Sequence, residues 1–591
     1  MTRAFVGIDL GTTHTAIAFG EPESDAASGT IATLLLPQRV ARDLVEARAL
    51  LPSVLRLAAG RGDGDVLPWG ATDHSVGEYA RQELMVSPGR VVASSKSWLV
   101  HRTVDRRAEL LPANAEEGVA KISPVAAARA VFEHLAGAWR AARGDELGTH
   151  DVVVTVPASF DVVARELTVE AARDAGLANV TLLEEPQAAF YSWMDRIGDT
   201  WRKALHVGDR VLVVDVGGGT TDFSLLRVAE EGGNLVLERV AVGDHLLLGG
   251  DNIDLALAHI ARGKIEAQGK SVDGAQAASL VGLARAAKEA LLAEGAPETF
   301  PLALAARGAK LMGGTLRTEL TRDEVHALAV DGFFPLVDAR ARPVQRVRSA
   351  IAQLGLPYAS DSAISRHLAA FLAAHAGENG VSMPTAVLFN GGVFKAAPLR
   401  SRVIDQLARW ASEVGVAAPR VLPGEDLDLA VSRGAAAFAR ARSGRGVRIR
   451  GATVVSYYVG IEDAAPAVPG MEPPMHALCI APQGMEEGSR AALPTDSIGV
   501  VVGETVQLRF FVSSSRTGDR AGTMFEHREN RDDLVELAPI RVQFTSTHTP
   551  PGEVVAARFE SEVTENAMLV LRALTTTGES FQVDLAVRDA S

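Results

Sequence analysis

The chain has 591 residues, too many for one hydrophobic core, so we expect several domains or subdomains. Its composition, with 47% hydrophobic and 22% charged residues, is that of a globular protein and excludes a collagen, a coiled coil or a largely disordered chain. The formal net charge of −14 disfavours nucleic acid as a partner, and without a run of about 18 apolar residues we expect no membrane span.

The first predicted element is a strand that leads into a glycine–threonine turn. The N-terminus reaches this strand without an apolar signal segment, so the expected compartment is the cytoplasm. The strand carries the motif Gly7-Ile8-Asp9-Leu10-Gly11-Thr12-Thr13, and a second strand is predicted over 16–19. Gly11 leaves backbone N–H groups open to phosphate oxygens, Thr12 and Thr13 add hydroxyl donors, and Asp9 can hold Mg²⁺ directly or through water.

The same pattern returns about two hundred residues later. Val213-Val214-Asp215-Val216 is followed by Gly217, Gly218, Gly219, Thr220, Thr221 and Asp222, and then by a strand over 223–226. For either hairpin alone, an ordinary tight turn is the alternative interpretation. Together they predict two related lobes, divided near residue 205, whose turns face each other and hold the β- and γ-phosphates of a nucleotide.

A third strand with a glycine pair is predicted at 387–392, with a helix starting near Pro398. Here the backbone of Gly391 and Gly392 could approach a nucleoside, and a plain strand–helix turn is the alternative. The arginines from 440 to 450 are interpreted as a solvated basic linker, with a docking surface as the alternative.

Helical periodicity fades after about residue 451, where β-branched alternation begins. One half-buried strand is expected over 506–510, and strands over 569–573 and 581–585 flank a turn and predict a hairpin. Cys479, the only cysteine, is expected to be a buried structural thiol. The predicted domains are an α/β domain over 1–440, a linker over 441–452 and an all-β sandwich over 453–591.

With these motifs in hand, the chain resembles the DnaK-type seventy-kilodalton heat-shock chaperones of the actin and hexokinase superfamily. The resemblance covers nearly the whole chain and implies a two-lobed, actin-like ATPase domain followed by a β-sandwich that binds substrate. Besides the hairpins, the matching segments are Val156 to Phe160, Glu185 to Ala189, Leu248 to Asp254 and Asn390 to Gly392.

The resemblance also implies roles for individual residues. Asp9 and Asp215 would hold Mg²⁺, Lys96 would stabilise charge on the γ-phosphate, and Glu185, Thr220 and Asp222 would order the phosphate, the metal shell and the attacking water. A surface lysine and a helix-start carboxylate are the alternatives for Lys96 and Glu185. Pro157 and Arg165 would transmit nucleotide state toward the second domain. The remaining ATP or ADP contacts would come from Gly249, Gly250, Lys288, Lys395 and Asp428.

The sequence departs from the family in three places. Arg285, Glu289 and Leu292 replace the usual residues of the adenosine-clamping helix, Lys395 stands where an arginine is usual, and His14 is unusual in the first hairpin. The segment 446–451 is charged where the family has an aliphatic linker. The sequence printed ends at Ser591, just past a strand, so we expect no helical lid.

The leading hypothesis is a slow, Mg²⁺-dependent ATPase that binds and releases unfolded or extended polypeptide, with a co-chaperone or nucleotide-exchange factor among its expected partners. The alternative is a nucleotide-switched scaffold that binds one dedicated protein partner. A small-molecule kinase is the third hypothesis, and it would leave the second domain unexplained.

Overall fold

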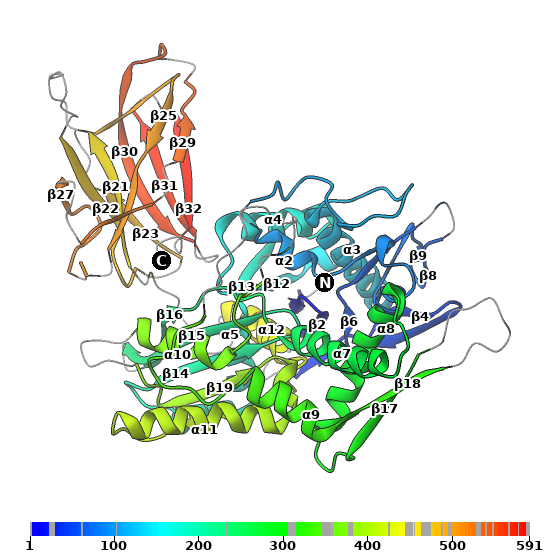
Figure 1. The fold of residues 1–591 in the computed structure, drawn as a ribbon. Coiled ribbons are helices and arrows are strands. Elements are labelled where there is room, and N and C mark those ends of the chain that lie inside the picture. Colours follow the sequence, from blue (N-terminus) through cyan, green and yellow to red (C-terminus); the bar gives the residue numbers. More distant parts are fainter. Residues whose placement is uncertain are drawn as a thin grey trace. The chain divides into compact units, whose positions relative to one another are not determined.

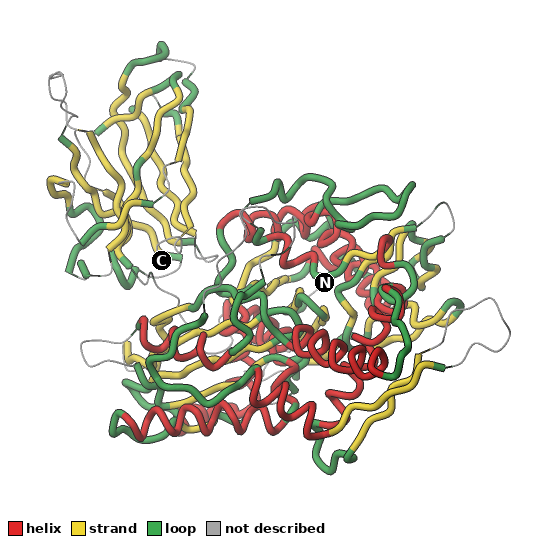
Figure 2. The backbone as a smooth tube through the Cα atoms, viewed as in Figure 1, coloured by secondary structure: helices red, strands yellow, loops and turns green. Residues whose placement is uncertain are grey.

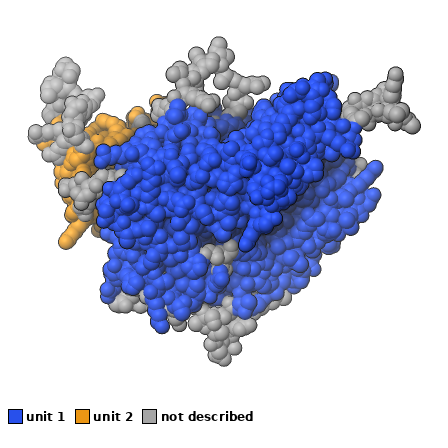
Figure 3. Space-filling view, turned by 60° about the horizontal axis from the view of Figure 1, so that its bottom comes forward, with its two compact units in different colours: residues 1–235, 241–448 blue, residues 236–240, 449–591 orange. Residues whose placement is uncertain are grey.

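The computed structural model divides the chain into two compact units, coloured separately in Figure 3. The first comprises Met1–Leu235 and Ala241–Arg448, and the second comprises Val236–Val240 and Ile449–Ser591. Figure 2 shows the first as a mixture of helices and strands and the second as strands and loops. The structure describes residues 3–22, 30–58, 60, 63–101, 103–231, 234–304, 315–344, 356, 358–375, 382–423, 426–443, 453, 455–462, 474–485, 488–493, 498–513, 515–516, 518–527, 533–537, 540–546, 549–564, 568–576 and 578–586.

The N-terminal half of the first unit is built on a sheet in the order β13-β12-β1-β2-β3, with β6 also paired to β2 (Figure 1). The predicted first hairpin is present: β1 and β2 are antiparallel, and Asp9 lies opposite Ala16. β12 runs parallel to β1, and β13 runs parallel to β12. The strands are β1 (Phe5–Leu10), β2 (His14–Gly20), β3 (Ile31–Thr33), β6 (Leu51–Pro52), β12 (Asp151–Val156) and β13 (Val180–Glu184).

A second sheet has the same order of connections, β20-β19-β14-β15-β16. β14 and β15 form the predicted second hairpin, in which Asp215 pairs with Asp222, and β19 runs parallel to β14. The repeated sequence motif therefore corresponds to a repeated arrangement of strands. The strands are β14 (Arg210–Val216), β15 (Thr221–Glu231), β16 (Asn234–Val242), β19 (Ala386–Asn390) and β20 (Arg420–Val421).

Helices α12 (Ala430–Arg442) and α5 (Glu185–Ile197) pack closely against each other, and α12 also lies on β1. Small residues permit this approach. A Cβ added to Gly434 would lie 1.7 Å from the Ala188 carbonyl oxygen, and one added to Gly7 would lie 2.2 Å from the Ser432 oxygen. The backbone of α12 is thus in direct contact with α5 and with β1.

Some of the other helices in the first unit begin with a side-chain cap. Ser123 and Asp161 accept hydrogen bonds from the amides of Ala126 and Ala164, and Asp273 forms a capping box with Gln276. The full set of these other helices, capped and uncapped, is α1 (Glu78–Glu83), α2 (Ser95–Leu99), α3 (Pro124–Arg143), α4 (Val162–Asp174), α6 (Trp201–Ala204), α7 (Gly250–Ala267), α8 (Gly274–Leu291), α9 (Arg322–His326), α10 (Ile364–Ala374) and α11 (Ala397–Glu413). Short helical turns are η1 (Pro88–Arg90), η2 (Leu147–Thr149), η3 (Gly198–Thr200), η4 (Ala327–Gly332) and η5 (Gly392–Lys395).

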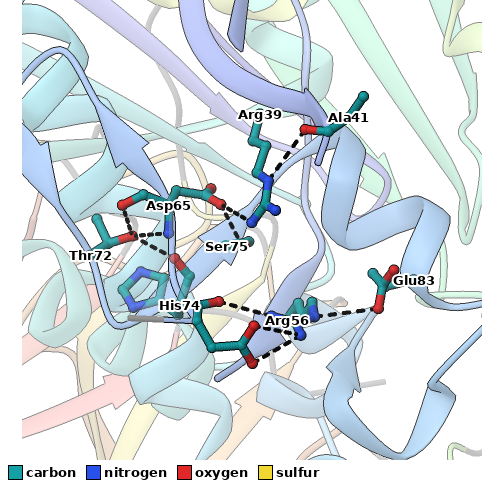
Figure 4. Close-up of polar contacts among 9 residues, drawn as sticks. Arg39, Ala41, Arg56, Asp65, Thr72, His74, Ser75 and Glu83 are labelled. Atoms are coloured by element: carbon teal, nitrogen blue, oxygen red, sulfur yellow. Dashed lines mark hydrogen bonds and ion pairs between the residues drawn. The ribbon is translucent and has the colours of Figure 1, made fainter. Parts of the chain in front are cut away.

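Small sheets extend the first unit, and a buried carboxylate holds one group of them together (Figure 4). Asp65 accepts hydrogen bonds from Ser75 Oγ at 2.6 Å and from Arg39 Nη1 at 3.3 Å. Close by, Arg56 contacts Asp63 at 3.0 Å and Glu83 at 3.4 Å. The strands are β4 (Leu36–Ala41), β5 (Leu44–Arg48), β7 (Leu55–Leu57), β8 (Val66–Leu67), β9 (Gly70–Ala71), β10 (His74–Val76), β11 (Val91–Val92), β17 (Thr299–Leu304) and β18 (Leu316–Thr321).

We expect His134 to make the first unit sensitive to acid. Its side chain is buried on α3, its Nε2 lies 2.9 Å from the Pro37 carbonyl oxygen, and burial lowers its pKa to about 4. The pKa of a histidine in the unfolded chain is 6.5, so above this pH the ring is neutral in both states and the fold has its full stability. As the pH falls from 6.5 toward 4, protonation favours the unfolded chain and this stability is lost. Relative to His134→Gln, which keeps an amide donor, the wild type should lose about 3 kcal/mol of unfolding free energy over this interval.

Urea unfolding followed by tryptophan fluorescence measures this effect in the first unit, because all six tryptophans lie in residues 1–448. An equal loss of stability in His134→Gln would contradict the assignment. His259→Asn, on an exposed position of α7, serves as the control.

The second unit contains two sheets that pack face to face. One has the order β27-β22-β21-β26-β28; the other has the order β23-β30-β31-β32 with β24 on β30, and β25 and β29 form a separate pair. Tyr457 and Val459 of the first sheet share a core with Leu569 and Leu571 of the second. The alternate residue, Tyr458, lies in a smaller cluster with Cys479. The strands are β21 (Ser456–Glu462), β22 (Met475–Ala481), β23 (Ser489–Leu493), β24 (Gly499–Val501), β25 (Thr505–Leu508), β26 (Phe510–Ser513), β27 (Met524–His527), β28 (Val535–Glu536), β29 (Ile540–Gln543), β30 (Val554–Val563), β31 (Met568–Thr575) and β32 (Ser580–Ala586).

Several sequence expectations for this part of the chain can be compared with the structure. The predicted hairpin is confirmed as β31 and β32, which are antiparallel. Cys479 is buried as expected, and burial raises the pKa of its thiol to about 12. The single strand expected over 506–510 is wrong: β25 ends at Leu508 and pairs with β29, whereas β26 starts at Phe510 and pairs with β21. The alternation continues through Arg509, but the chain changes its pairing partner there.

The interpretation of the arginine-rich segment as a solvated linker is wrong for Arg440. This residue is buried in α12 and forms an ion pair with Asp195 of α5, and Arg442 bonds to Thr181 Oγ1 at 2.5 Å. The helix thus continues to Arg442. Residues 444–452 of the predicted linker lie outside the described residues. No helix in the described ranges is both long enough and apolar enough to span a membrane.

Candidate nucleotide site

A cavity of about 480 Å³ in the first unit brings together residues from both hairpins. Most of the residues predicted for a nucleotide line it. Those from the sequence prediction are Asp9, Gly11, Thr12, Thr13, Lys96, Glu185, Asp215, Gly217, Gly218, Thr220, Gly250, Lys288, Gly391, Gly392, Lys395 and Asp428.

The two hairpin turns contact each other directly. A Cβ added to Gly218 would lie 2.1 Å from Thr13 Oγ1, and one added to Gly219 would lie 2.8 Å from Thr12 Cγ2. An added Cβ at Gly218 would also lie 3.0 Å from Thr13 Cβ, so glycine at this position permits the close approach of the two turns. The arrangement places exposed backbone amides and hydroxyl groups on both sides of one space, as phosphate recognition requires.

Lys96 and Glu185, which are 89 residues apart in the chain, form an ion pair at the cavity wall. Lys96 comes from the short helix α2, and Glu185 is the first residue of α5. Their side chains are only 6% and 13% exposed. The Lys96 ammonium group also lies 5.7 Å from the centre of the Phe160 ring. A cation held this rigidly in a shielded site can stabilise negative charge that develops on a phosphoryl group.

Two half-buried carboxylates line the same cavity as this pair. Burial, followed by the charge of Glu185, raises the pKa of Asp9 to about 7, and the same two causes raise the pKa of Asp215 well above its usual value. Asn390 donates to Asp215 Oδ2 at 2.7 Å, while Asn390 Oδ1 and Thr13 Oγ1 are buried without a hydrogen-bond partner. The excess negative charge and the unsatisfied oxygens fit a Mg²⁺–phosphate group, which would supply the missing cation and acceptors.

The described residues contain no group of three or more His, Cys, Asp and Glu side chains arranged to hold a metal ion. For a bound Mg²⁺, Asp9 and Asp215 are the carboxylates that would hold it, with water and phosphate oxygens as further ligands. This is a usual arrangement for Mg²⁺, which sheds its water reluctantly and is commonly bound through one or two carboxylates.

Further residues that line the cavity are cations that already form ion pairs. Asp254 is fully buried and accepts ion pairs from Arg285 Nε at 2.8 Å and Lys288 Nζ at 2.7 Å. Lys395 is paired with Asp428, next to the glycine turn at 391–392. The ion pair with buried Asp254 thus orients Lys288 at the wall before a ligand enters, whereas the Lys395 side chain is 55% exposed.

His14, Arg81 and Arg285 also belong to the cavity lining. Burial, followed by the charges of Arg81 and Arg285, lowers the pKa of His14 to about 4, so its ring is neutral near pH 7. Glu289 and Leu292 line the cavity as well. The residues noted as departures in the sequence therefore all line this one cavity, and the neutral His14 ring is among them.

Five predicted residues are not among those that line the cavity. Gly219 belongs to the second hairpin, and Gly249 directly precedes α7, whose first amides, those of Gly250 and Asp251, donate to the carbonyl oxygens of Gly217 and Gly218 and dock the helix on that hairpin. Pro157 lies in the turn between β12 and α4, and Arg165 fastens that turn, bonding to the Phe160 oxygen at 3.1 Å and to Glu184 at 3.1 Å. Asp222 lies beside the same turn.

The sequence analysis gave no role to several residues at or beside the site. Asn390 and Asp254 lie inside segments that match the family, and the place of Asn390 at a strand end beside Asp215 is the signal that could have given it a role. Arg81 lies in no such segment. Ser159 and His245, which contact Asp222, are brought together only by the fold.

The first unit is mixed α/β, with a charged cavity lined by residues of two similarly connected sheets, and the second unit is all-β, as the resemblance to a two-lobed, actin-like domain with an added β-sandwich implies. Comparison with known proteins agrees. The family described as Hsp70 protein matches residues 63–353. A chaperone protein HscA homolog of Bordetella petrii is 30% identical over 433 residues, which cover 71% of this chain and 59% of that protein.

Two other relatives are similar. The chaperone protein HscA homolog of Pseudomonas fluorescens is 33% identical over 347 residues, which cover 55% of this chain and 46% of that protein. The chaperone protein HscA of Edwardsiella ictaluri is 33% identical over 301 residues, which cover 49% of this chain and 42% of that protein. The chain belongs to the Hsp70 family. Its matches span about half the length of these relatives.

Proposed function

We propose that the chain is a chaperone-like protein that hydrolyses ATP with Mg²⁺ and couples hydrolysis to the binding and release of polypeptide. The observation that carries this proposal is the buried Lys96–Glu185 pair, set between two glycine hairpins in the same cavity as Asp9 and Asp215. The names of its relatives as chaperone proteins support the second part.

The residues have separate tasks in this proposal. Backbone amides of Gly11, Gly217 and Gly218 and the hydroxyl groups of Thr12, Thr13 and Thr220 bind the phosphates. Mg²⁺, when bound, supplies the charge that neutralises the phosphate oxygens, and Asp9 and Asp215 hold it. Lys96 stabilises charge on the terminal phosphoryl group, while Glu185 fixes Lys96 and accepts hydrogen bonds from water.

Nucleotide state would pass to the second unit through the turn at Pro157. Arg165 links this turn to Glu184, the residue directly before Glu185, so a shift of Glu185 on hydrolysis changes the support of the turn. In the second unit, we propose that the β-sandwich binds extended polypeptide by its loops and strand edges. Release of phosphate would then alter the grip on the polypeptide.

Single-turnover ATP hydrolysis, measured with Mg²⁺ in the presence and absence of a permanently unfolded polypeptide, tests this function. Hydrolysis that the polypeptide accelerates is the expected result. Hydrolysis that responds only to one native protein would favour the nucleotide-switched scaffold, and hydrolysis stimulated by a sugar or a small acid would favour a kinase. Absence of both hydrolysis and nucleotide binding would overturn the proposal.

A further inference from the structure

Ser159, His245 and Asp222 form a compact polar cluster beside the proposed catalytic residues. Ser159 Oγ lies 2.7 Å from Asp222 Oδ1 and 3.0 Å from His245 Nδ1, and His245 Nδ1 lies 3.2 Å from Asp222 Oδ1. The side chains of His245 and Asp222 are 11% and 5% exposed. The His245 ring also packs edge-on against Phe160, with 6.0 Å between ring centres.

The numbers of donors and acceptors on these three side chains assign the hydrogens in the cluster. An ionised Asp222 can only accept, and Ser159 has one hydrogen, which it donates to Asp222 at the shortest of the three contacts. His245 Nδ1 then faces two acceptors, Ser159 Oγ and Asp222 Oδ1, so Nδ1 carries a hydrogen. Both groups therefore contact one carboxylate oxygen, Asp222 Oδ1: the Ser159 hydroxyl at 2.7 Å and the His245 Nδ1–H at 3.2 Å.

The same assignment excludes a serine nucleophile. In a Ser-His-Asp hydrolase, the two ring nitrogens of the histidine contact the serine and the aspartate separately, and the nitrogen that faces the serine accepts its proton. Here one nitrogen, Nδ1, contacts both partners, and it is a donor. Ser159 therefore donates to Asp222 and is not activated.

The position of the cluster connects the two sheets. Asp222 is on β15, directly opposite Asp215 in the second hairpin, whereas Ser159 is in the turn that follows β12 of the first sheet. His245 follows β16, and the backbone bonds between Thr221 and Leu246 hold it beside Asp222. Phe160, the neighbour of Ser159, contacts both His245 and Lys96. The cluster thus connects the second hairpin with the turn after β12, beside the cavity and outside its lining.

We propose that Ser159 and His245 are positioning residues for nucleotide hydrolysis. Together they orient the Asp222 carboxylate and tie it to the turn at Pro157, so that Asp222 is correctly placed only when the two sheets are close. This inference rests on the proposed hydrolysis of ATP. The turn at Pro157 would then be held in two ways: by the hydrogen bond from Ser159 to Asp222 and by the bonds of Arg165.

Single and double variants of the full-length protein test the proposal. Ser159→Ala and His245→Phe each remove a donor, and the phenyl ring keeps the packing against Phe160. Each should lower the single-turnover rate with saturating Mg²⁺–ATP about tenfold, because a hydrogen bond to a charged group is lost. The Kd for ADP, measured with a fluorescent analogue, should change less than about twofold, because the phosphate-binding groups are intact.

The conservative variants should restore the rate. Ser159→Thr keeps the hydroxyl, and His245→Asn keeps an N–H donor near the position of Nδ1, so both should recover most of the loss. Since both donors act on one carboxylate, Ser159→Ala/His245→Phe should lose little more than either single variant. Ser412→Ala and His259→Asn, at exposed positions of α11 and α7, are the matched controls.

Wild-type rates in both Ser159→Ala and His245→Phe would overturn the inference while leaving the proposed ATPase intact. A loss of nucleotide affinity and of urea stability that parallels the loss of rate would also overturn it, because the residues would then be structural only. If the wild type binds no nucleotide and hydrolyses none, the proposed function itself fails and the inference falls with it.

Discussion

Lys96→Ala is expected to slow single-turnover ATP hydrolysis by roughly 10²- to 10³-fold, as removal of a preorganised charge donor does in other enzymes. The Lys96 side chain is 6% exposed, and Glu185 fixes its ammonium group. A lysine on the protein surface could not take over this position. Nucleotide binding should be largely retained, because the glycine turns and hydroxyl groups that line the cavity are unchanged. The measurement is a quench of radiolabelled ATP hydrolysis together with a nucleotide-binding titration.

The partner residue sharpens this prediction. Glu185→Gln removes the charge that fixes Lys96 and should also slow hydrolysis, but the double variant should lose much less than the product of the two single effects, because the two residues act as a unit. Lys270→Ala, which removes an exposed lysine, is the matched control. A Lys96→Ala protein that hydrolyses ATP at the wild-type rate would remove Lys96 from the mechanism.

Much of the candidate site could be predicted because its signals are local. Each phosphate turn is a contiguous run in which strand, aspartate, glycine and threonine follow one another, as in 7–13 and 213–222. The chain order of these runs also indicated the two lobes, and the two sheets with the same connections agree with that expectation.

Other features depend on contacts between distant segments and leave no local pattern. The sequence marked Lys96 and Glu185 separately, but only the fold shows them as an ion pair. The contacts of Ser159 and His245 with Asp222 join residues 63 and 23 positions apart. Arg440 seemed exposed from its charged neighbours, yet helix α12 turns it toward Asp195, where an ion pair offsets the cost of burial.

The β-rich region shows a limit of periodicity. Alternation over 506–510 reports which faces of the chain are apolar, and it stays regular while the chain leaves one partner strand for another at Arg509. Pairing is decided by neighbours that lie far away in the sequence, so the break could not be found from the pattern.

The largest loss of stability in the first unit is expected from Gly434→Ala. The new methyl group would lie 1.7 Å from the Ala188 carbonyl oxygen and 2.5 Å from its carbon, and both are backbone atoms of α5 that no side-chain rotation can move. Helices α5 and α12 would have to separate, which would disturb the helix that begins with Glu185 and the contact of α12 with β1. We expect at least about 3 kcal/mol of destabilisation, or failure to fold.

The same substitution elsewhere provides the control. Gly263 is an exposed position within α7, and no atom lies within 4 Å of an added Cβ. Gly263→Ala should therefore stabilise the unit by about 0.5–1 kcal/mol, through helix propensity alone. Urea unfolding followed by tryptophan fluorescence compares the two variants, since every tryptophan lies in this unit and Trp193 lies on α5 itself. Equal midpoints for both variants would show that α5 and α12 do not meet as closely as the structure has them, and the placement of Glu185 at the cavity wall would then lose its support.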